Sequence, residues 1–262
     1  MRFGLVIAYD GTHFHGSQIQ ARVRTIQGEI EETLANIYGQ SVRVRLASRT
    51  DMGVHAECQV GRADINTEHG PETVMQALNH NMADDLRITS ADSVSACFDP
   101  RRDALAREYV YTITDAEVPA PLNRDFEAPV RGPLDHETMG RVGTLFEGTH
   151  DFMSFAGSAT SVDSSAIRRV DKLRVTRQRD RVTISVRANA FVHQQMRRLV
   201  AVLVDVGRGL ASKDTIVTLL DSPRKGAANK LMPARGLCLT RIFYARASGT
   251  FLPAAWRGSL CP

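Results

Sequence analysis

The stretch Val42-Arg-Val-Arg-Leu-Ala-Ser-Arg-Thr-Asp-Met-Gly-Val-His-Ala-Glu57 joins a strand-like pattern to a polar turn, and we interpret the rest of the chain around it. Its first hydrophobic residues alternate with arginines, which is the two-residue period of a strand with one buried face. Asp51 therefore comes just after a predicted strand. If the backbone stays extended there, Arg49 and Asp51 project to the same side, and the guanidinium can hold the carboxylate ionised and aimed.

Two interpretations of this turn stay open from the residues alone. An Arg-x-Asp beside a glycine is common in ordinary surface turns. The same residues would also suit an active site, because a carboxylate kept ionised by a neighbouring arginine can act as a nucleophile or stabilise charge.

Length and composition are those of an ordinary globular protein. The chain has 262 residues, of which 43% are hydrophobic and 24% charged, enough for one large domain or two lobes. No apolar run approaches the roughly 18 residues of a membrane span, and Met1-Arg-Phe3 enters a strand pattern directly. We therefore expect a cytoplasmic protein without a signal peptide.

Basic residues are concentrated in the second part of the chain. Residues 1–100 carry 8 Arg or Lys against 13 Asp or Glu, whereas residues 101–262 carry 25 against 16. The excess, mostly arginine, suits bidentate contacts to phosphates, so it predicts a grip on a polyanion. A merely solvated basic surface is the alternative.

Cysteine and histidine spacing gives no sign of a metal centre. The four cysteines are scattered without a Cys-x-x-Cys pair, and His13-Phe-His15 is the closest approach to ligand spacing. We predict neither a metal site nor a disulfide framework.

Hydrophobic periodicity predicts an α+β protein. Strand patterns occupy residues 2–9, 59–65 and 107–113, and a hairpin is expected over 168–187. Helices are expected between Thr25 and Gly39, from Pro71, from Asp135 and from Phe191, the last with His193 and Arg197 on one face of its first turn. A proline-rich connection at 115–133 favours a division into lobes of residues 1–104 and 105–262.

Six strings together resemble the tRNA pseudouridine synthase A family. The clearest is Ser48-Arg-Thr-Asp-Met-Gly-Val-His-Ala56, and the others, in chain order, begin at Tyr9, Phe98, Gly148, Phe191 and Pro233. The resemblance implies two similar lobes that share a mixed, mainly antiparallel sheet flanked by helices, the pseudouridine synthase fold. Many members have Trp where this chain has Ser17, so we expect a different branch, of archaeal type, and no effect of this departure on the catalytic step.

The same resemblance implies the activity and its residues. The family isomerises uridine to pseudouridine in the anticodon stem-loop of tRNA, at positions 38, 39 and/or 40, as a homodimer and without a cofactor. Carried over residue by residue, Asp51 is the catalytic carboxylate, with Arg49 and Tyr109 beside it. Substrate contacts are expected from Tyr109 and a further group of residues: Arg101, Arg107, His193, Arg197 and Leu237.

Two other functions are weighed against this isomerase. A non-catalytic RNA-binding protein on the same fold would keep the arginines and dispense with Asp51 or Tyr109, and both are present. A hydrolase built on His150, Asp151 and Ser154 lacks the Gly-x-Ser-x-Gly turn that would present its serine.

Overall fold

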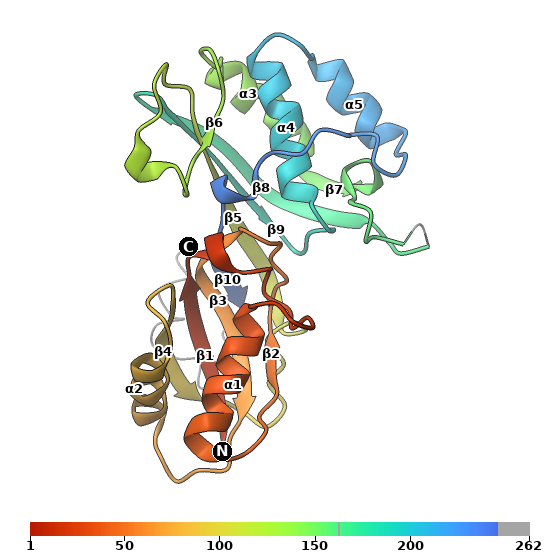
Figure 1. The fold of residues 1–262 in the computed structure, drawn as a ribbon. Coiled ribbons are helices and arrows are strands. Elements are labelled where there is room, and N and C mark those ends of the chain that lie inside the picture. The colour runs from red at the N-terminus through yellow and green to blue at the C-terminus, as the bar shows by residue number, and fades with distance from the viewer. Residues whose placement is uncertain (162, 246–262) are drawn as a thin grey trace. The chain divides into compact units, whose positions relative to one another are not determined.

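A computed structural model describes residues 1–161 and 163–245, and in these residues the chain forms ten strands and five α-helices (Figure 1). The strands are β1 (Arg2–Tyr9), β2 (Val44–Leu46), β3 (His55–Asp64), β4 (Leu86–Ser93), β5 (Ala104–Thr114), β6 (Ala128–Pro129), β7 (Gly148–Asp151), β8 (Ile167–Gln178), β9 (Arg181–Ala188) and β10 (Leu237–Tyr244). The α-helices are α1 (Ile26–Tyr38), α2 (Pro71–Asn81), α3 (His136–Gly143), α4 (Gln195–Gly207) and α5 (Lys213–Asp221).

The strands are hydrogen-bonded in the order β4-β1-β3-β10-β5-β9-β8-β7, with β2 paired to β3 and β6 to β5. The pairs β1·β3, β1·β4, β5·β9 and β8·β9 are antiparallel, whereas β5·β6 is parallel. The predicted fold class, a mixed and mainly antiparallel sheet with flanking helices, is therefore confirmed.

The chain separates into two compact units, each described by itself below. Among the described residues, unit 1 contains residues 1–106 together with 239–245, and unit 2 contains Arg107–Cys238. The boundary that the sequence predicts after residue 104 stays a prediction. The last strand, β10, is hydrogen-bonded to both β3 and β5.

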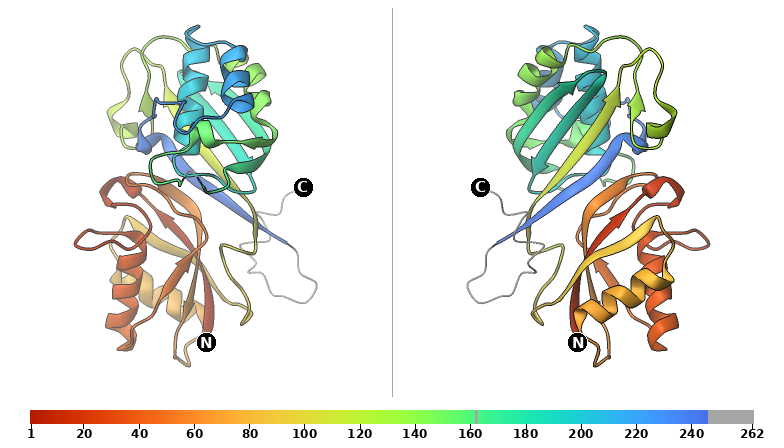
Figure 2. Two further views of the ribbon diagram at one scale, coloured as in Figure 1. Left: turned by 90° about the vertical axis from the view of Figure 1, so that its right-hand side faces the viewer. Right: turned by 90° about the vertical axis from the view of Figure 1, so that its left-hand side faces the viewer.

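Unit 1 is built on β1, whose inward side chains Phe3, Leu5 and Ile7 are completely buried. Helix α1 begins where predicted, because the Thr25 hydroxyl accepts the Gly28 N–H, and it ends at Gly39 in the left-handed conformation that glycine tolerates. In Figure 2, α1 and α2 lie on one face of this part of the sheet.

Helix α2 is tied to strand β4 through Asn79. The Asn79 side chain donates to the Ile88 carbonyl and accepts the Ile88 N–H, both at 2.8 Å. Its role is therefore structural.

Unit 2 places α3, α4 and α5 on one face of its strands, and the right-hand view of Figure 2 looks onto the opposite face. Its core includes three buried phenylalanines, with ring centroids 5.4 to 6.4 Å apart: Phe146, Phe152 and Phe155. Helix α3 starts as predicted, with the Asp135 side chain accepting the Thr138 N–H.

A buried ion pair fixes the start of the connection after β5. The Asp115 side chain is 3% exposed, accepts both Arg177 terminal nitrogens at 2.5 and 3.1 Å, and accepts the Leu134 N–H at 2.9 Å. Burial opposes ionisation of Asp115, but these hydrogen bonds outweigh it and hold the pKa of the carboxyl below its usual value.

Replacing Arg177 should therefore destabilise unit 2, because it leaves a buried carboxylate without its cation. We expect Arg177→Met to lower the free energy of unfolding by about 2 to 3 kcal/mol at neutral pH in urea titrations. The pKa of Asp115 is lower in the folded protein than in the unfolded chain. The stability that the ion pair contributes is therefore fully present above the unfolded pKa and is lost as pH falls through the folded pKa. The difference in unfolding free energy between Arg177→Met and the native protein should therefore become smaller in acid.

A matched control lies on the same strand. Arg169 pairs with Asp171 at 2.8 Å, but its side chain is 59% exposed, so Arg169→Met should cost less than about 1 kcal/mol. Equal losses from the two variants would contradict the importance assigned to burial.

Candidate active site

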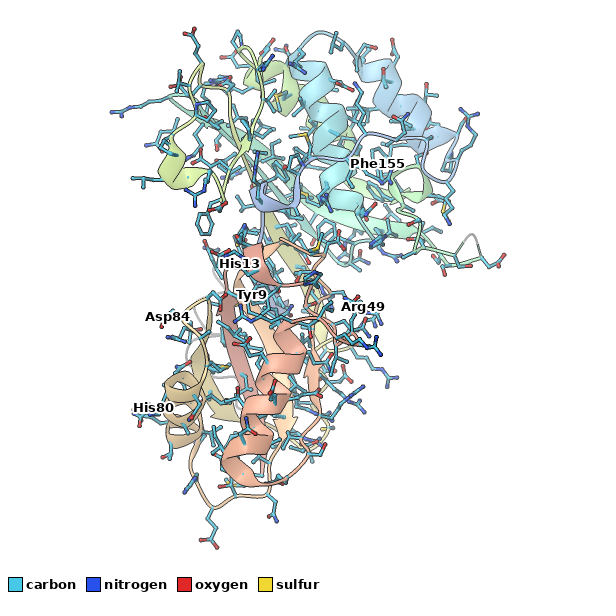
Figure 3. All side chains as sticks on the ribbon, viewed as in Figure 1. Tyr9, His13, Arg49, His80, Asp84 and Phe155 are labelled. Atoms are coloured by element: carbon cyan, nitrogen blue, oxygen red, sulfur yellow. The ribbon has the colours of Figure 1, made fainter. Side chains whose placement is uncertain are left out.

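Asp51 lies in the loop of residues 47–54 that joins β2 to β3, as the sequence predicts. It is half-buried, while its neighbour Arg49 is exposed at the surface of unit 1 (Figure 3). The chain turns at Gly53, which has a φ of 76° and donates its N–H to the Phe14 carbonyl at 3.4 Å. The alignment of Arg49 with Asp51 stays a prediction.

Side chains from other segments hold the backbone of this loop. The Gln59 amide accepts the Ser48 N–H at 3.0 Å and donates to the Ser48 carbonyl at 2.8 Å. The Ser17 hydroxyl accepts the Thr50 N–H at 2.9 Å, and the hydroxyls of Tyr9 and Thr50 share a hydrogen bond of 2.8 Å. The residues on both sides of Arg49 are thus fixed by hydrogen bonds.

Ser17 is therefore in contact with the residue that precedes Asp51. Whether the departure at Ser17 affects the catalytic step stays a prediction, but the structure joins Ser17 directly to the loop that carries Asp51. The signal that sequence reasoning missed is the pair Gly16-Ser17. Gly16 has a φ of 90°, and a Cβ there would lie 2.9 Å from the Thr50 carbonyl oxygen, so the two segments approach closely.

The segment that carries Ser17 is itself anchored by Arg24. The Arg24 guanidinium contacts both Glu29 and Asp85, and its central carbon lies 4.0 Å from the centroid of the Phe14 ring. Hydrogen bonds to Asp85 and Glu29 raise the pKa of Arg24, so it stays charged.

Arg101 also belongs to unit 1 and lies in a tight turn. The Asp99 carboxylate accepts the N–H groups of Arg101 and Arg102, each at 3.0 Å, and Asp103 donates its own N–H to the Asp99 carbonyl. This hydrogen bonding defines the path of the loop around Arg101.

The remaining predicted site residues belong to unit 2. On β5, Arg107 and Tyr109 pair with Ala188 and Val186 of β9 and are buried. Arg107 donates to the Asn189 carbonyl at 2.8 Å, and the Tyr109 ring meets the Phe191 ring edge-on, with 5.0 Å between centroids. Phe191 is the neighbour of Tyr109 that sequence reasoning did not single out.

The predicted helix from Phe191 begins later than expected, at Gln195. Gln194 has a φ of 62°, and the Gln195 side chain accepts the Val192 N–H at 2.8 Å, which closes a separate turn before the helix. His193 therefore lies outside α4, and the prediction that it shares a helical face with Arg197 is wrong.

His193 and Arg197 instead contact different segments. The His193 carbonyl accepts the Gly157 N–H at 2.8 Å, whereas Arg197 Nε donates to the Met232 carbonyl at 2.8 Å. Leu237, at the start of β10, is 6% exposed.

The side chains suggested for a hydrolase serve the local fold. His150 Nε2 lies 2.9 Å from the Glu147 carbonyl, Asp151 accepts the Met153 N–H at 2.9 Å, and Ser154, fully buried, accepts the Arg224 N–H at 3.1 Å. These contacts give the hydrolase no support.

Neither a metal-binding group nor a membrane-spanning helix occurs within residues 1–161 and 163–245. These residues contain no group of three or more His, Cys, Asp or Glu side chains that could hold a metal ion. In the same ranges, no helix is long and apolar enough to cross a membrane.

Comparison with known proteins identifies the class of enzyme. Residues 5–101 and 144–245 match the family described as tRNA pseudouridine synthase. Because this match covers well over half of the chain, the chain belongs to the tRNA pseudouridine synthase family and is an isomerase. Asp51, Arg49 and Arg101 lie in the first matched range and His193, Arg197 and Leu237 in the second, whereas Arg107 and Tyr109 fall between them.

The curated relatives carry a more particular name, tRNA pseudouridine synthase A. The protein of Halalkalibacterium halodurans is 36% identical over 237 residues, which is 90% of both chains. That of Pelobacter propionicus is 35% identical over 240 residues, or 92% of this chain and 98% of the relative. A solved chain from a Cbf5-Nop10-Gar1 complex has 12% identity and a TM-score of 0.37 over 91% of this chain and 58% of its own, too low to support a conclusion.

The two tyrosines of β5 should respond differently to loss of the hydroxyl. Tyr111 is fully buried and donates to the Pro233 carbonyl at 2.6 Å, so Tyr111→Phe should lower the free energy of unfolding by about 1 to 2 kcal/mol. We expect its reaction rate to stay within a factor of about two, whereas Tyr109→Phe should slow the reaction by about 100-fold. Rate assays with urea titrations separate these roles, and a slow Tyr111→Phe enzyme would contradict them.

Proposed function

We propose that the protein isomerises uridine to pseudouridine in the anticodon stem-loop of tRNA, at positions 38, 39 and/or 40, with Asp51 as the catalytic carboxylate. The activity rests on membership of the tRNA pseudouridine synthase family and on relatives named tRNA pseudouridine synthase A. The position within tRNA rests on the resemblance of the six strings to that family.

One observation carries the assignment of Asp51. It is a half-buried carboxylate next to a residue, Thr50, whose N–H, carbonyl and hydroxyl are all hydrogen-bonded. A catalytic group is effective when its geometry is fixed before the substrate arrives, because the cost of orienting it is then met during folding. The hydrogen bonds of Thr50 hold the backbone that precedes Asp51 in such a fixed position.

The reaction requires no net oxidation or reduction. The bond between uracil N1 and ribose C1′ breaks, a bond between uracil C5 and C1′ forms, the proton on C5 is lost, and N1 gains a proton. An ionised carboxylate can attack carbon or stabilise positive charge on the sugar, so Asp51 serves whether it adds to uracil C6 or to ribose C1′. We therefore propose that the enzyme works without a cofactor.

Tyr109 is proposed to stack on the detached uracil and to help remove the C5 proton. Its ring packs nearly perpendicular to the Phe191 ring, with 5.0 Å between centroids, and this contact limits the orientations that the Tyr109 ring can take. Arg107, which donates to the Asn189 carbonyl, is proposed to contact the substrate, and Arg49 is proposed to orient Asp51. Leu237 is proposed to pack against the base, and Arg101, His193 and Arg197 to contact the RNA backbone.

The target base must leave its stack before it can react, which costs a few kcal/mol. Contacts between arginines and phosphates can offset this cost, and residues 101–262 supply 25 basic residues against 16 acidic ones. Lys172, Arg174 and Arg181 are exposed on the β8–β9 hairpin. We propose that these side chains contact the phosphates of the RNA.

We expect Asp51→Asn and Asp51→Ala to lower turnover by at least about 1,000-fold, because each removes the reacting carboxylate. The affinity for tRNA should change by less than about threefold, since a single acidic side chain contributes no phosphate contact. Tritium release from tRNA that carries 5-tritiated uridine measures turnover, because the hydrogen on C5 leaves, and filter binding measures affinity.

Asp64→Asn is the control for this experiment. Asp64 is an exposed carboxylate of unit 1 that pairs with Arg2, so its loss should leave turnover unchanged. Turnover by Asp51→Asn near the native rate would refute the catalytic role of Asp51. Loss of tRNA binding together with turnover would assign Asp51 to recognition instead.

We further propose that the enzyme acts in the cytoplasm as a homodimer that holds one tRNA across both subunits. Sedimentation equilibrium should then give a mass near twice the 28.9 kDa of the chain. A titration of the protein with tRNA should saturate at one tRNA for every two chains. A protein that sediments as a monomer at assay concentration while still active would contradict the dimer.

A further inference from the structure

Thr50, the residue before Asp51, is held from two sides by side chains that the proposed reaction does not use. On one side, Ser17 makes reciprocal hydrogen bonds with it: the Thr50 N–H donates to Ser17 Oγ at 2.9 Å, and the Ser17 N–H donates to the Thr50 carbonyl at 3.1 Å. On the other side, the Tyr9 hydroxyl bonds to Thr50 Oγ1 at 2.8 Å. Figure 3 labels Tyr9 in the part of unit 1 that contains this contact.

These contacts are shielded from water. Ser17 is 1% exposed, Tyr9 5% and Thr50 7%. A buried hydroxyl that lost its partner would stay unsatisfied, so solvent cannot replace these hydrogen bonds easily. The arrangement therefore persists while unit 1 is folded.

Ser17 in turn is fixed to the start of α1. The Gly16 and Ser17 carbonyls accept the N–H groups of Ile26 and Gln27, at 3.3 and 3.0 Å. A continuous chain of hydrogen bonds thus runs from the first turn of a helix, through Ser17, to Thr50.

We propose that Ser17 is a positioning residue for Asp51, assisted by Tyr9. This inference rests on the proposed role of Asp51 as the catalytic carboxylate. Ser17 acts through Thr50 and does not contact the RNA.

The geometry of the peptide bond explains how hydrogen bonds to Thr50 can set the position of Asp51. The Thr50 N–H belongs to the peptide plane before Thr50, and its carbonyl belongs to the plane that leads to Asp51. Because Ser17 bonds to both groups, the orientation of both planes is set. The Cα of Asp51 is then fixed in space, and only the rotations of Asp51 itself remain.

Ser17→Ala tests this inference, because it removes the acceptor of the Thr50 N–H and adds no bulk. We expect the single-turnover rate of tritium release to fall by about 10- to 100-fold, as for a small misplacement of a reacting group. The Kd for tRNA should stay within about twofold. Ser17→Thr keeps the hydroxyl and should recover most of the rate.

Ser154→Ala is the matched control. Ser154 is also fully buried, and its hydroxyl also accepts one backbone N–H, that of Arg224 at 3.1 Å, but it belongs to unit 2. Its loss should reduce thermal stability to a similar extent while leaving the single-turnover rate within about twofold. A purely structural role for Ser17 would instead make the two variants alike.

Tyr9→Phe provides a second route if Ser17→Ala folds poorly. It keeps the buried ring, removes the hydrogen bond to Thr50 Oγ1, and should slow the reaction without weakening tRNA binding. Native rates for both Ser17→Ala and Tyr9→Phe, with Asp51→Ala inactive, would overturn the positioning role and leave the proposed function intact. An active Asp51→Ala would overturn both.

Discussion

A buried loop must find hydrogen-bond partners for its backbone, and this requirement governs the architecture around Asp51. Between β2 and β3 the chain leaves the strand ladder while Ala47 and Thr50 remain buried. The Gln59 side chain bonds to the N–H and the carbonyl of Ser48. The Ser17 hydroxyl accepts the Thr50 N–H, and the Ser17 backbone N–H donates to the Thr50 carbonyl. These two pairs of hydrogen bonds take the place of a neighbouring strand.

The side chains that hold the loop come from elements that are distant in sequence. Gln59 is supplied by β3, Tyr9 by the end of β1, and Ser17 by a segment that leads into α1. That segment is held by Arg24, which joins Glu29 to Asp85 and covers Phe14. The loop is therefore tied to several elements of unit 1, which would suit the proposed role of Asp51, because a catalytic group needs a supported position.

Local patterns were sufficient to predict much of the fold. Alternation in residues 2–9 and the capping residues Thr25 and Gly39 act within a few residues, and the elements they predict are confirmed. The late start of α4 could not be foreseen, because it depends on Gln194 in a left-handed conformation and on a side-chain bond from Gln195. The role of Ser17 was also hidden, since its partner Thr50 is distant in the chain. Asp51 was predicted from its place after a strand pattern and from the family motif. The side chains that hold its loop could not be predicted, because they come from distant parts of the chain.

Gly16 approaches Thr50 so closely that a side chain at position 16 would not fit. The folding of unit 1 and the position of the Asp51 carboxylate are therefore linked. The geometry around Asp51 exists only after β1, β3 and the start of α1 have assembled. Opening of residues 10–25 alone would break both hydrogen bonds between Ser17 and Thr50 while most hydrogen bonds of the sheet persist. Under the proposed role of Asp51, local unfolding of this segment would disable the enzyme before global unfolding does, and resistance to inactivation would follow the stability of one short segment.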